Sequence, residues 1–267
     1  MNEKVQKAIQ RIQTFEPPDG YFLAFSGGKD SQTIYHLALE AGVKFDAHYH
    51  LNSVDPPEVV YFIRDNYPNV IVDRPKMTMW QLIVKKKFPP TRMIRYCCSE
   101  LKEGGGMGRT VMTGIRWAES TRRKATRSML ELNAYSKSKI MLNNDNDEAR
   151  RMFETCQLKG KHILNPIVDW SEDDVWEYLN SRGISHCCLY DEGFKRIGCV
   201  GCPMSGKKGM LRDFERWPKY YDAYLRAFER MIAAREQAGQ ETTKDWMRSP
   251  QSIMHWWIYG KEAAEDG

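Results

Sequence analysis

The 267-residue sequence has no long hydrophobic run: none approaches the roughly 18 consecutive apolar residues that a transmembrane helix requires. It also shows no apolar signal-peptide core or cleavage site, because its first 18 residues are polar and helical in period. No internal repeats are found. These absences argue against a membrane protein, a secreted protein and a repeat protein, and we expect a cytoplasmic enzyme with no membrane partner.

Cysteine is scarce and odd in number, with seven residues in the chain. An odd count without an export signal argues against a disulfide framework and favours metal or redox chemistry. The net charge of +5 is modest, but the basic residues are bunched around positions 85–87, 116–127 and 207–212. Such bunching suggests a phosphate-bearing partner, although a solvated basic surface explains most such runs when each is taken singly.

Short apolar runs alternate with helical patterns along most of the chain. The strand candidates are residues 21–25, 45–51, 69–73, 109–115 and 162–168. The helix candidates between and after them are residues 31–42, 57–67, 77–87, 119–135 and 170–183. This alternation predicts an α/β fold, with a mostly parallel, Rossmann-like sheet and helices on both faces.

The strand pattern stops after residue 184. A cysteine-rich loop, residues 185–209, leads into helical patterns over about 210–238 and 250–261. We therefore expect a nucleotide-binding α/β domain over residues 1–184 and a helical appendage over residues 185–267 that packs on the same core.

The stretch AFSGGKDSQT, residues 24–33, lies between the first strand and the first helix of the sheet. Open α/β sheets bind ligands at this edge, and two glycines let backbone N–H groups approach phosphate oxygens. Lys29 adds a positive charge, and Ser26 and Ser31 add hydroxyl donors. Asp30 beside phosphates is unfavourable unless it binds Mg²⁺ or caps the helix, so Mg²⁺ ligation is a reasonable hypothesis.

The sequence SGGKDS resembles the pyrophosphate loop (PP-loop) of the ATP-pyrophosphatase and phosphoadenylylsulfate (PAPS) reductase superfamily, and it is not a Walker A motif, GxxxxGK[ST]. The resemblance implies an adenine-nucleotide alpha-hydrolase-like fold and cleavage of ATP between its α and β phosphates. It implies that Ser26, Gly27, Gly28, Lys29, Asp30 and Ser31 bind ATP, with Lys29 and Asp30 catalytic. A glycine turn without a ligand is the alternative.

Two more segments are similar to that superfamily. In NSVDPPEVVYFI, residues 52–63, Asp55 and Glu58 are expected near the nucleotide. In TGIRWAESTRR, residues 113–123, the resemblance implies that Gly114, Arg116, Ser120 and Arg123 face phosphates or the acceptor, with Arg116 catalytic. An ordinary helix start with surface arginines remains the alternative for this second segment.

Four cysteines form a tandem pair, Cys97 and Cys98, and a C-x-x-C pair, Cys199 and Cys202. The tandem pair resembles that of the assimilatory adenylylsulfate reductases, which implies a four-iron, four-sulfur (4Fe-4S) cluster on these residues. Zinc on the same residues and unliganded core cysteines remain alternatives. The roles of three further cysteines stay open. They are Cys156, Cys187 and Cys188.

No cysteine follows Cys202, so the nucleophile that sulfonucleotide reductases carry in an E-C-G-L-H-like tail is not found here. The chain thus more closely resembles the ATP-cleaving, iron–sulfur component of DNA phosphorothioation systems. This resemblance implies an ATP pyrophosphatase and sulfurtransferase that adenylylates a nucleic acid, with a cysteine desulfurase as sulfur donor. The alternatives are a sulfonucleotide reductase that forms sulfite and a nucleotide-binding redox sensor without turnover. The oligomeric state stays open, a homodimer being one option.

Overall fold

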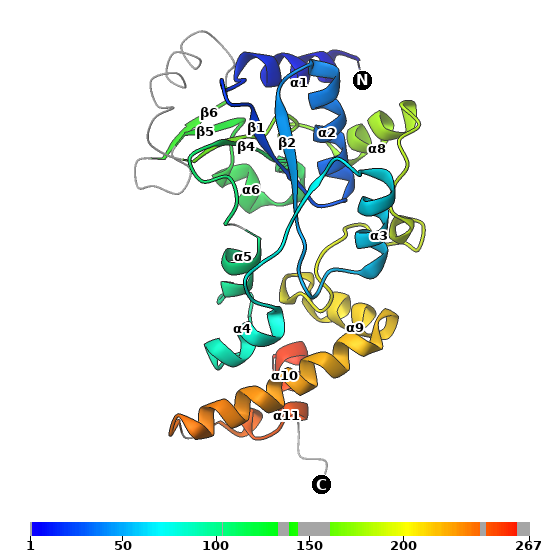
Figure 1. Cartoon of the computed structure of the whole chain (residues 1–267). Coiled ribbons are helices and arrows are strands. Elements are labelled where there is room, and N and C mark those ends of the chain that lie inside the picture. The colour runs from blue at the N-terminus through cyan, green and yellow to red at the C-terminus, as the bar shows by residue number, and fades with distance from the viewer. Residues whose placement is uncertain (1, 103, 133–138, 144–160, 241–243, 261–267) are drawn as a thin grey trace. The chain divides into compact units, whose positions relative to one another are not determined.

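The computed structural model describes residues 2–102, 104–132, 139–143, 161–240 and 244–260 (Figure 1). The chain divides into two compact units, each assembled from separate stretches of sequence. Unit 1 contains residues 1–50, 58–73 and 105–197. Unit 2 contains residues 51–57, 74–104 and 198–267. The expected boundary after residue 184, between the nucleotide-binding domain and a helical appendage on the same core, lies within unit 1 and stays a prediction.

Unit 1 is built on a seven-stranded sheet, counted over the described residues, with the strand order β3-β2-β1-β4-β7-β5-β6. β1 (Tyr21–Phe25), β2 (Phe45–His50), β3 (Ile71–Asp73), β4 (Thr110–Met112) and β7 (His162–Leu164) run parallel. β5 (Leu130–Leu132) and β6 (Ile140–Leu142) add an antiparallel edge. The fold is therefore the expected Rossmann-like α/β class with a mostly parallel sheet.

Helices connect and cover these strands. α1 (Asn2–Thr14), α2 (Lys29–Ala41) and α8 (Glu172–Ser181) pack in sequence, α1 on α2 and α2 on α8. α3 (Pro57–Asn66) lies between β2 and β3 in the chain, and the short α6 (Thr121–Thr126) follows the 3-10 turn η1 (Trp117–Glu119). α8 begins as expected, because the Ser171 hydroxyl accepts the Asp174 N–H and the Asp174 carboxylate accepts the Ser171 N–H.

Several elements differ from the sequence prediction. The helix Tyr96–Leu101 and strand β6 were not expected, and the helix expected over about 210–238 is interrupted at residue 217. The expected helix over residues 119–135 is wrong in its described part: α6 ends at Thr126, and residues 130–132 form strand β5, which pairs with β7 and β6, while residues 133–135 lie outside the described residues. The central residue of that strand, Glu131, is buried and accepts hydrogen bonds from Arg127 and Asn165. These partners lie outside the strand in sequence, so the local pattern resembles a charged, exposed helical position.

Unit 2 is helical in the described residues. It contains α4 (Met79–Lys86), α5 (Tyr96–Leu101), α9 (Gly206–Arg216), α10 (Pro218–Gln237) and α11 (Pro250–Tyr259). Its own hydrophobic core includes Leu82, Phe228, Met231, Ile253 and Trp257. The C-terminal helices thus share a core with α4 and α5, which precede β4 in the sequence. Among all described helices, none has the length and apolar character required to span a membrane.

Candidate functional site

The loop between β1 and α2 has the conformation that its glycines allow. Gly27 has a φ of 70°, in the left-handed region, and a Cβ there would lie 2.9 Å from the Cδ1 of Ile63. Gly28 is the N-cap of α2 and provides no side chain to cap it. The first N–H groups of a helix have no intrahelical partners. The loop therefore brings backbone donors to the carboxyl end of β1, where the Tyr190 hydroxyl accepts one of them, the Lys29 N–H.

Two serines close the loop on itself. The Ser31 hydroxyl donates to the Gly28 carbonyl at 2.8 Å and accepts the Ser26 N–H at 3.2 Å. The Ser26 hydroxyl oxygen lies 3.2 Å from the Ser31 hydroxyl oxygen. Ser26 and Ser31 thus fix the loop's curvature, in addition to the donor role that the sequence predicts for them.

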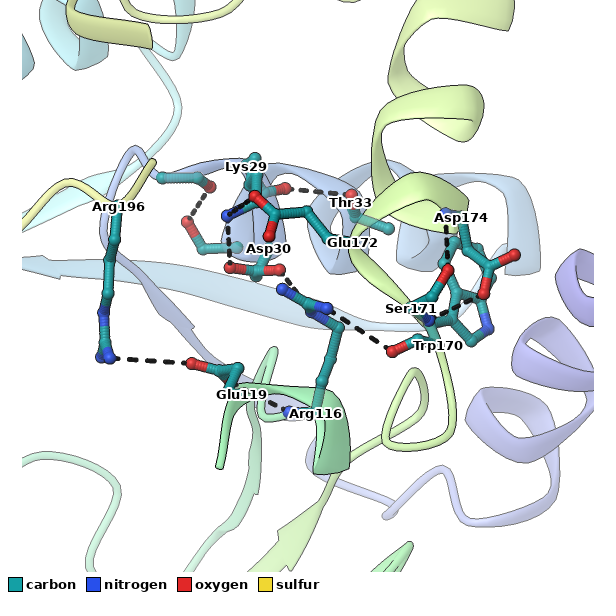
Figure 2. A network of polar contacts seen from close by, with 12 residues as sticks. Lys29, Asp30, Thr33, Arg116, Glu119, Trp170, Ser171, Glu172, Asp174 and Arg196 are labelled. Atoms are coloured by element: carbon teal, nitrogen blue, oxygen red, sulfur yellow. Dashed lines mark hydrogen bonds and ion pairs between the residues drawn. The ribbon is translucent and has the colours of Figure 1, made fainter. Parts of the chain in front are cut away.

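The Lys29 side chain is buried in unit 1, and its ammonium lies among oxygen atoms (Figure 2). Its Nζ donates to the Lys195 carbonyl at 3.2 Å and lies 3.6 Å from a carboxylate oxygen of each of Asp30 and Glu172. Glu172 begins α8 and is half exposed. Sequence analysis assigned no role to Glu172, because its acidic first-turn position is explained by helix capping alone.

Arg116 lies against the same loop. Its Nε donates to Asp30 Oδ1 at 2.7 Å, and its Nη1 lies 3.5 Å from the Trp170 carbonyl (Figure 2). Gly114 permits this approach, since a Cβ there would lie 2.8 Å from the Asp30 carbonyl oxygen. Two residues of the 113–123 segment therefore meet the loop that they were expected to accompany.

The four charged groups at this site balance one another. Lys29 and Arg116 are cationic, Asp30 and Glu172 are anionic, and Asp30 contacts both cations. The set has a formal charge of zero. A polyphosphate would therefore gain little from these groups unless a further cation joined the two carboxylates.

Ser120 and Arg123 have local partners. The Ser120 hydroxyl caps α6 by accepting the Arg123 N–H at 3.2 Å. The Arg123 guanidinium pairs with the Glu119 carboxylate. The same carboxylate lies 3.8 Å from Arg196 Nη1 (Figure 2). Burial, together with Arg196 and Arg127 nearby, lowers the pKa of Arg123. Their expected contacts with phosphate or acceptor stay predictions.

The structure separates Asp55 from Glu58 by unit. Asp55 is buried in unit 2, where its carboxylate accepts hydrogen bonds from the Asn52 N–H at 3.0 Å and the Asn52 amide at 2.8 Å. It also lies 3.8 Å from Lys102 Nζ. Glu58 is in the first turn of α3, in unit 1, close enough to Cys187 to raise that thiol's pKa slightly. Nucleotide contact by either carboxylate stays a prediction.

Tyr190 is a site residue that sequence analysis missed. Its hydroxyl accepts the Lys29 backbone N–H at 2.9 Å, and the Lys29 ammonium lies 5.7 Å from its ring centroid. Burial raises its pKa well above the usual value. The sequence gives little indication of this role, because Tyr190, between Cys188 and Cys199, belongs to no motif with a distinctive spacing.

The four cysteines assigned to a cluster meet in unit 2. Cys97 and Cys98, in α5, and Cys199 and Cys202, from a loop about a hundred residues later, line one cavity. Its walls also include Met79, Leu101, Lys102, Pro203 and Tyr224. The Arg95 guanidinium lies 3.3 Å from the Cys98 sulfur. The structure therefore brings together cysteines that are distant in sequence.

The cavity is electrostatically distinctive. Contact with Cys98, burial and the two distant cysteines raise the pKa of Cys97, and burial raises that of Cys199. For Lys102, burial acts to lower the pKa, but Cys199, Asp55 and Cys202 together outweigh it and the pKa is raised. All six cysteines in the described part of the chain are free, and Cys156 lies outside it. Over the same residues, no three His, Cys, Asp or Glu side chains are placed to hold one metal ion.

Residues 20–205 match the phosphoadenosine phosphosulfate reductase domain. The chain belongs to that family. Its relatives include an adenosine 5'-phosphosulfate reductase of Neisseria meningitidis serogroup B, 31% identical over 125 residues, which are 46% of this chain and 42% of the relative. An uncharacterised protein of Methanocaldococcus jannaschii is 27% identical over 219 residues, 78% of this chain and 47% of the relative.

Solved structures related to this member of the PAPS reductase family include a PAPS reductase from Candida auris in complex with phosphate. It has a TM-score of 0.45 and 16% identity, over 68% of this chain and 82% of that one. An FMN adenylyltransferase from Candida glabrata with FMN and an ATP analogue has a TM-score of 0.45 and 14% identity, over 74% of this chain and 64% of that one. The chain spans less than half the length of the first curated relatives that it matches.

Proposed function

We propose that this PAPS reductase family member cleaves ATP between its α and β phosphates and uses the adenylyl group in a sulfur-transfer reaction. The charge balance at the phosphate loop carries the proposal. Lys29 and Arg116 are already matched by Asp30 and Glu172, so a triphosphate requires an additional cation. Mg²⁺ held by the two carboxylates supplies it, and Mg²⁺ normally accompanies ATP.

Each residue at the site then has a distinct role. The N–H groups that begin α2 bind phosphate oxygens. Lys29 shifts from its carboxylate partners to the departing pyrophosphate and stabilises the charge that develops there. Arg116, held at 2.7 Å by Asp30, binds a phosphate oxygen with its remaining N–H donors. Bound Mg²⁺ contributes further charge neutralisation at the phosphates.

The unit 2 cavity fits a 4Fe-4S cluster held by Cys97, Cys98, Cys199 and Cys202. Four sulfur atoms face one cavity with apolar walls, and Lys102 and Arg95 lie beside the sulfur atoms and offset an anionic cluster. Zinc on the same four cysteines is the alternative, and it would require all four sulfurs at about 2.3 Å from a single ion. When bound, the cluster supplies electron transfer or a sulfur-binding iron.

A nucleic acid is the acceptor that we propose, with a cysteine desulfurase as the sulfur donor. The bunched arginines and lysines near Arg116 support a polyanionic acceptor close to the phosphate loop. A sulfonucleotide reductase is the second candidate, and the identity with the Neisseria reductase favours it.

One experiment separates these functions. The protein, purified without oxygen, is incubated with ATP and Mg²⁺ plus tRNA or DNA, and separately with adenylyl sulfate or PAPS plus a thiol. Pyrophosphate release is the expected result, whereas sulfite release without pyrophosphate would establish the reductase. Nucleotide binding with neither product would establish a sensor. Brown colour with absorbance near 400 nm and iron in the protein would support the cluster, and zinc without iron would contradict it.

A further inference from the structure

Residues 185–195 are held against the amino end of α2 at three points. The Gln32 side-chain amide donates to the Ser185 carbonyl at 2.7 Å. The Lys29 N–H donates to the Tyr190 hydroxyl at 2.9 Å, and the Lys29 ammonium donates to the Lys195 carbonyl at 3.2 Å. All of these residues belong to unit 1. The segment is therefore fixed beside the phosphate loop on both sides of its two cysteines.

Those cysteines, Cys187 and Cys188, differ in environment. Cys187 is completely buried and Cys188, at the start of the 3-10 turn η2 (Cys188–Tyr190), is exposed. Burial is the main cause that raises the pKa of Cys187 to about 11, and the neighbouring Cys188 thiol adds to the increase. The pair thus combines an accessible sulfur with a protected one on the next residue of the chain.

The turn that carries the pair is tied together locally. The Tyr190 N–H donates to the Cys187 carbonyl at 3.0 Å, so the tyrosine that contacts Lys29 and the buried cysteine share one turn. The His186 ring lies 2.9 Å from the Asp191 carboxylate across the same turn, and Trp176 packs on both His186 and Tyr190. A fixed turn of this kind keeps the sulfur position constant relative to the phosphate loop.

We propose that Cys188 carries the transferred sulfur as a persulfide and that Cys187 resolves the product. This inference rests on the proposed function and assigns its sulfur-carrying residues. The Cys188 thiolate attacks the outer sulfur of a donor persulfide, and the donor leaves as a thiolate. The Cys188 persulfide then attacks the adenylylated atom of the acceptor, and AMP departs. Cys187 then attacks the Cys188 sulfur and its proton passes to the departing sulfur of the acceptor, which releases the thiolated acceptor and leaves a Cys187–Cys188 disulfide.

A dithiol reductant, such as a thioredoxin-type protein, returns the disulfide to two thiols and is itself oxidised to a disulfide. The geometry of adjacent cysteines suits this step. Their Cα atoms are about 3.8 Å apart, whereas unstrained disulfides have roughly 4.4–6.8 Å. A strained disulfide is reduced readily, as a disulfide formed in every turnover must be. The pair can thus turn over without the four cysteines of unit 2.

The test uses the full-length protein and glutathione persulfide as the donor. After incubation, accessible thiols and persulfides are alkylated, and peptides are examined by mass spectrometry for one added sulfur. We expect the added sulfur on Cys188 in the wild type, in Cys187→Ser and in the control Cys156→Ser, and none at this turn in Cys188→Ser. An unlabelled wild type, or full labelling of the turn in Cys188→Ser, would overturn the proposal.

Two further readouts separate this inference from the proposed function. Pyrophosphate release with ATP precedes sulfur attack, so Cys188→Ser should retain it while thiolated acceptor falls at least a hundredfold. Cys187→Ser should accumulate acceptor joined to Cys188 by a disulfide that added dithiothreitol releases. Equal thiolation by wild type and Cys188→Ser would overturn the sulfur-carrier role alone. If the wild type releases no pyrophosphate but still forms a persulfide on Cys188, the proposed ATP cleavage is overturned instead. Sulfonation of Cys188 by adenylyl sulfate would overturn persulfide carriage and favour the reductase.

Discussion

The two units differ in how they hold charge. Unit 1 has 21 lysines and arginines against 22 aspartates and glutamates, and its site groups are paired with one another. Unit 2 has 19 against 13, a net charge of +6, and its cavity holds four thiols among apolar side chains. The modest charge of the whole chain therefore conceals a neutral unit and a basic one.

This difference favours a different kind of ligand in each unit: a phosphate with its cation in unit 1 and a metal in unit 2. The paired charges of unit 1 can be rearranged by an incoming phosphate and its cation, because each ion pair can exchange one partner for another. The thiols of unit 2 lie in a poorly solvated cavity. Burial there disfavours a negatively charged thiolate unless a bound metal stabilises it. Mutations in the two units should accordingly affect chemistry in unit 1 and assembly in unit 2.

The largest expected effect is at Lys29. Lys29→Met keeps the buried stem but removes the ammonium, which lies 3.6 Å from Asp30 and which we propose stabilises the departing pyrophosphate. We expect pyrophosphate release to fall by roughly 10²–10³-fold, the usual loss when one charged donor to a transition state is removed. Steady-state kinetics with ATP and Mg²⁺ measure it. Lys44→Met, on the exposed end of the α2–β2 connection, is the control and should leave the rate unchanged; a similar loss in both variants would contradict the assignment.

In unit 2, Cys199→Ser should act on assembly. Cys199 is one of the four ligands in the cluster that we propose, so its replacement should remove the expected brown colour and lower the Tm by roughly ten degrees, because ligation contributes folding energy to the loops that it joins. Absorbance, iron analysis and calorimetry measure both effects. Cys188→Ser in unit 1 should keep the colour and the Tm, and a bleached Cys188→Ser protein would place the cluster ligands elsewhere.

The sequence predicts the order of most elements and the phosphate loop because these depend on local patterns. The strand over residues 21–25, the start of α8 at Ser171 and the loop glycines all depend on neighbours within a few residues. What it missed depends on distant partners. The buried Glu131 carboxylate depends on contacts with Asn165 and Lys139, and Tyr190 contacts Lys29, which lies 161 positions away in the sequence. The four cysteines line one cavity, and their assignment to a cluster, which came from family resemblance and not from local pattern, stays a prediction.

Glu131 gives a stability test within unit 1 that leaves the site intact. Its buried carboxylate receives Lys139 at 2.6 Å, Arg127 at 3.1 Å and Asn165 at 3.1 Å. Glu131→Leu removes the only anion among these partners, and although Lys139 and Asn165 keep the Thr126 and Ser128 carbonyls as acceptors, the two cations lose their counter-charge, so we expect the free energy of unfolding to fall by about 3 kcal/mol. Glu131→Gln keeps an acceptor oxygen and should lose less. Urea titration followed by circular dichroism measures both, and a Leu variant as stable as the wild type would show that the cluster of charges contributes nothing.

The smallest effect concerns the acceptor, and it decides which unit binds it. In the reaction that we propose, the adenylyl group forms in unit 1, so we expect the acceptor contacts there. The greater net charge of unit 2 would then contribute only long-range attraction. Arg122 and Lys124 are exposed on α6, whereas Arg116, Arg123 and Arg127 face carboxylates. Changing Arg122 and Lys124 to Gln should flatten the slope of log K against log salt by about two units and barely alter ATP affinity. The matched pair in unit 2, Lys207→Gln with Lys208→Gln, should leave the slope within a few tenths of a unit. A flattened slope from the unit 2 pair alone would contradict this prediction. It would assign the acceptor contacts to unit 2 instead of unit 1.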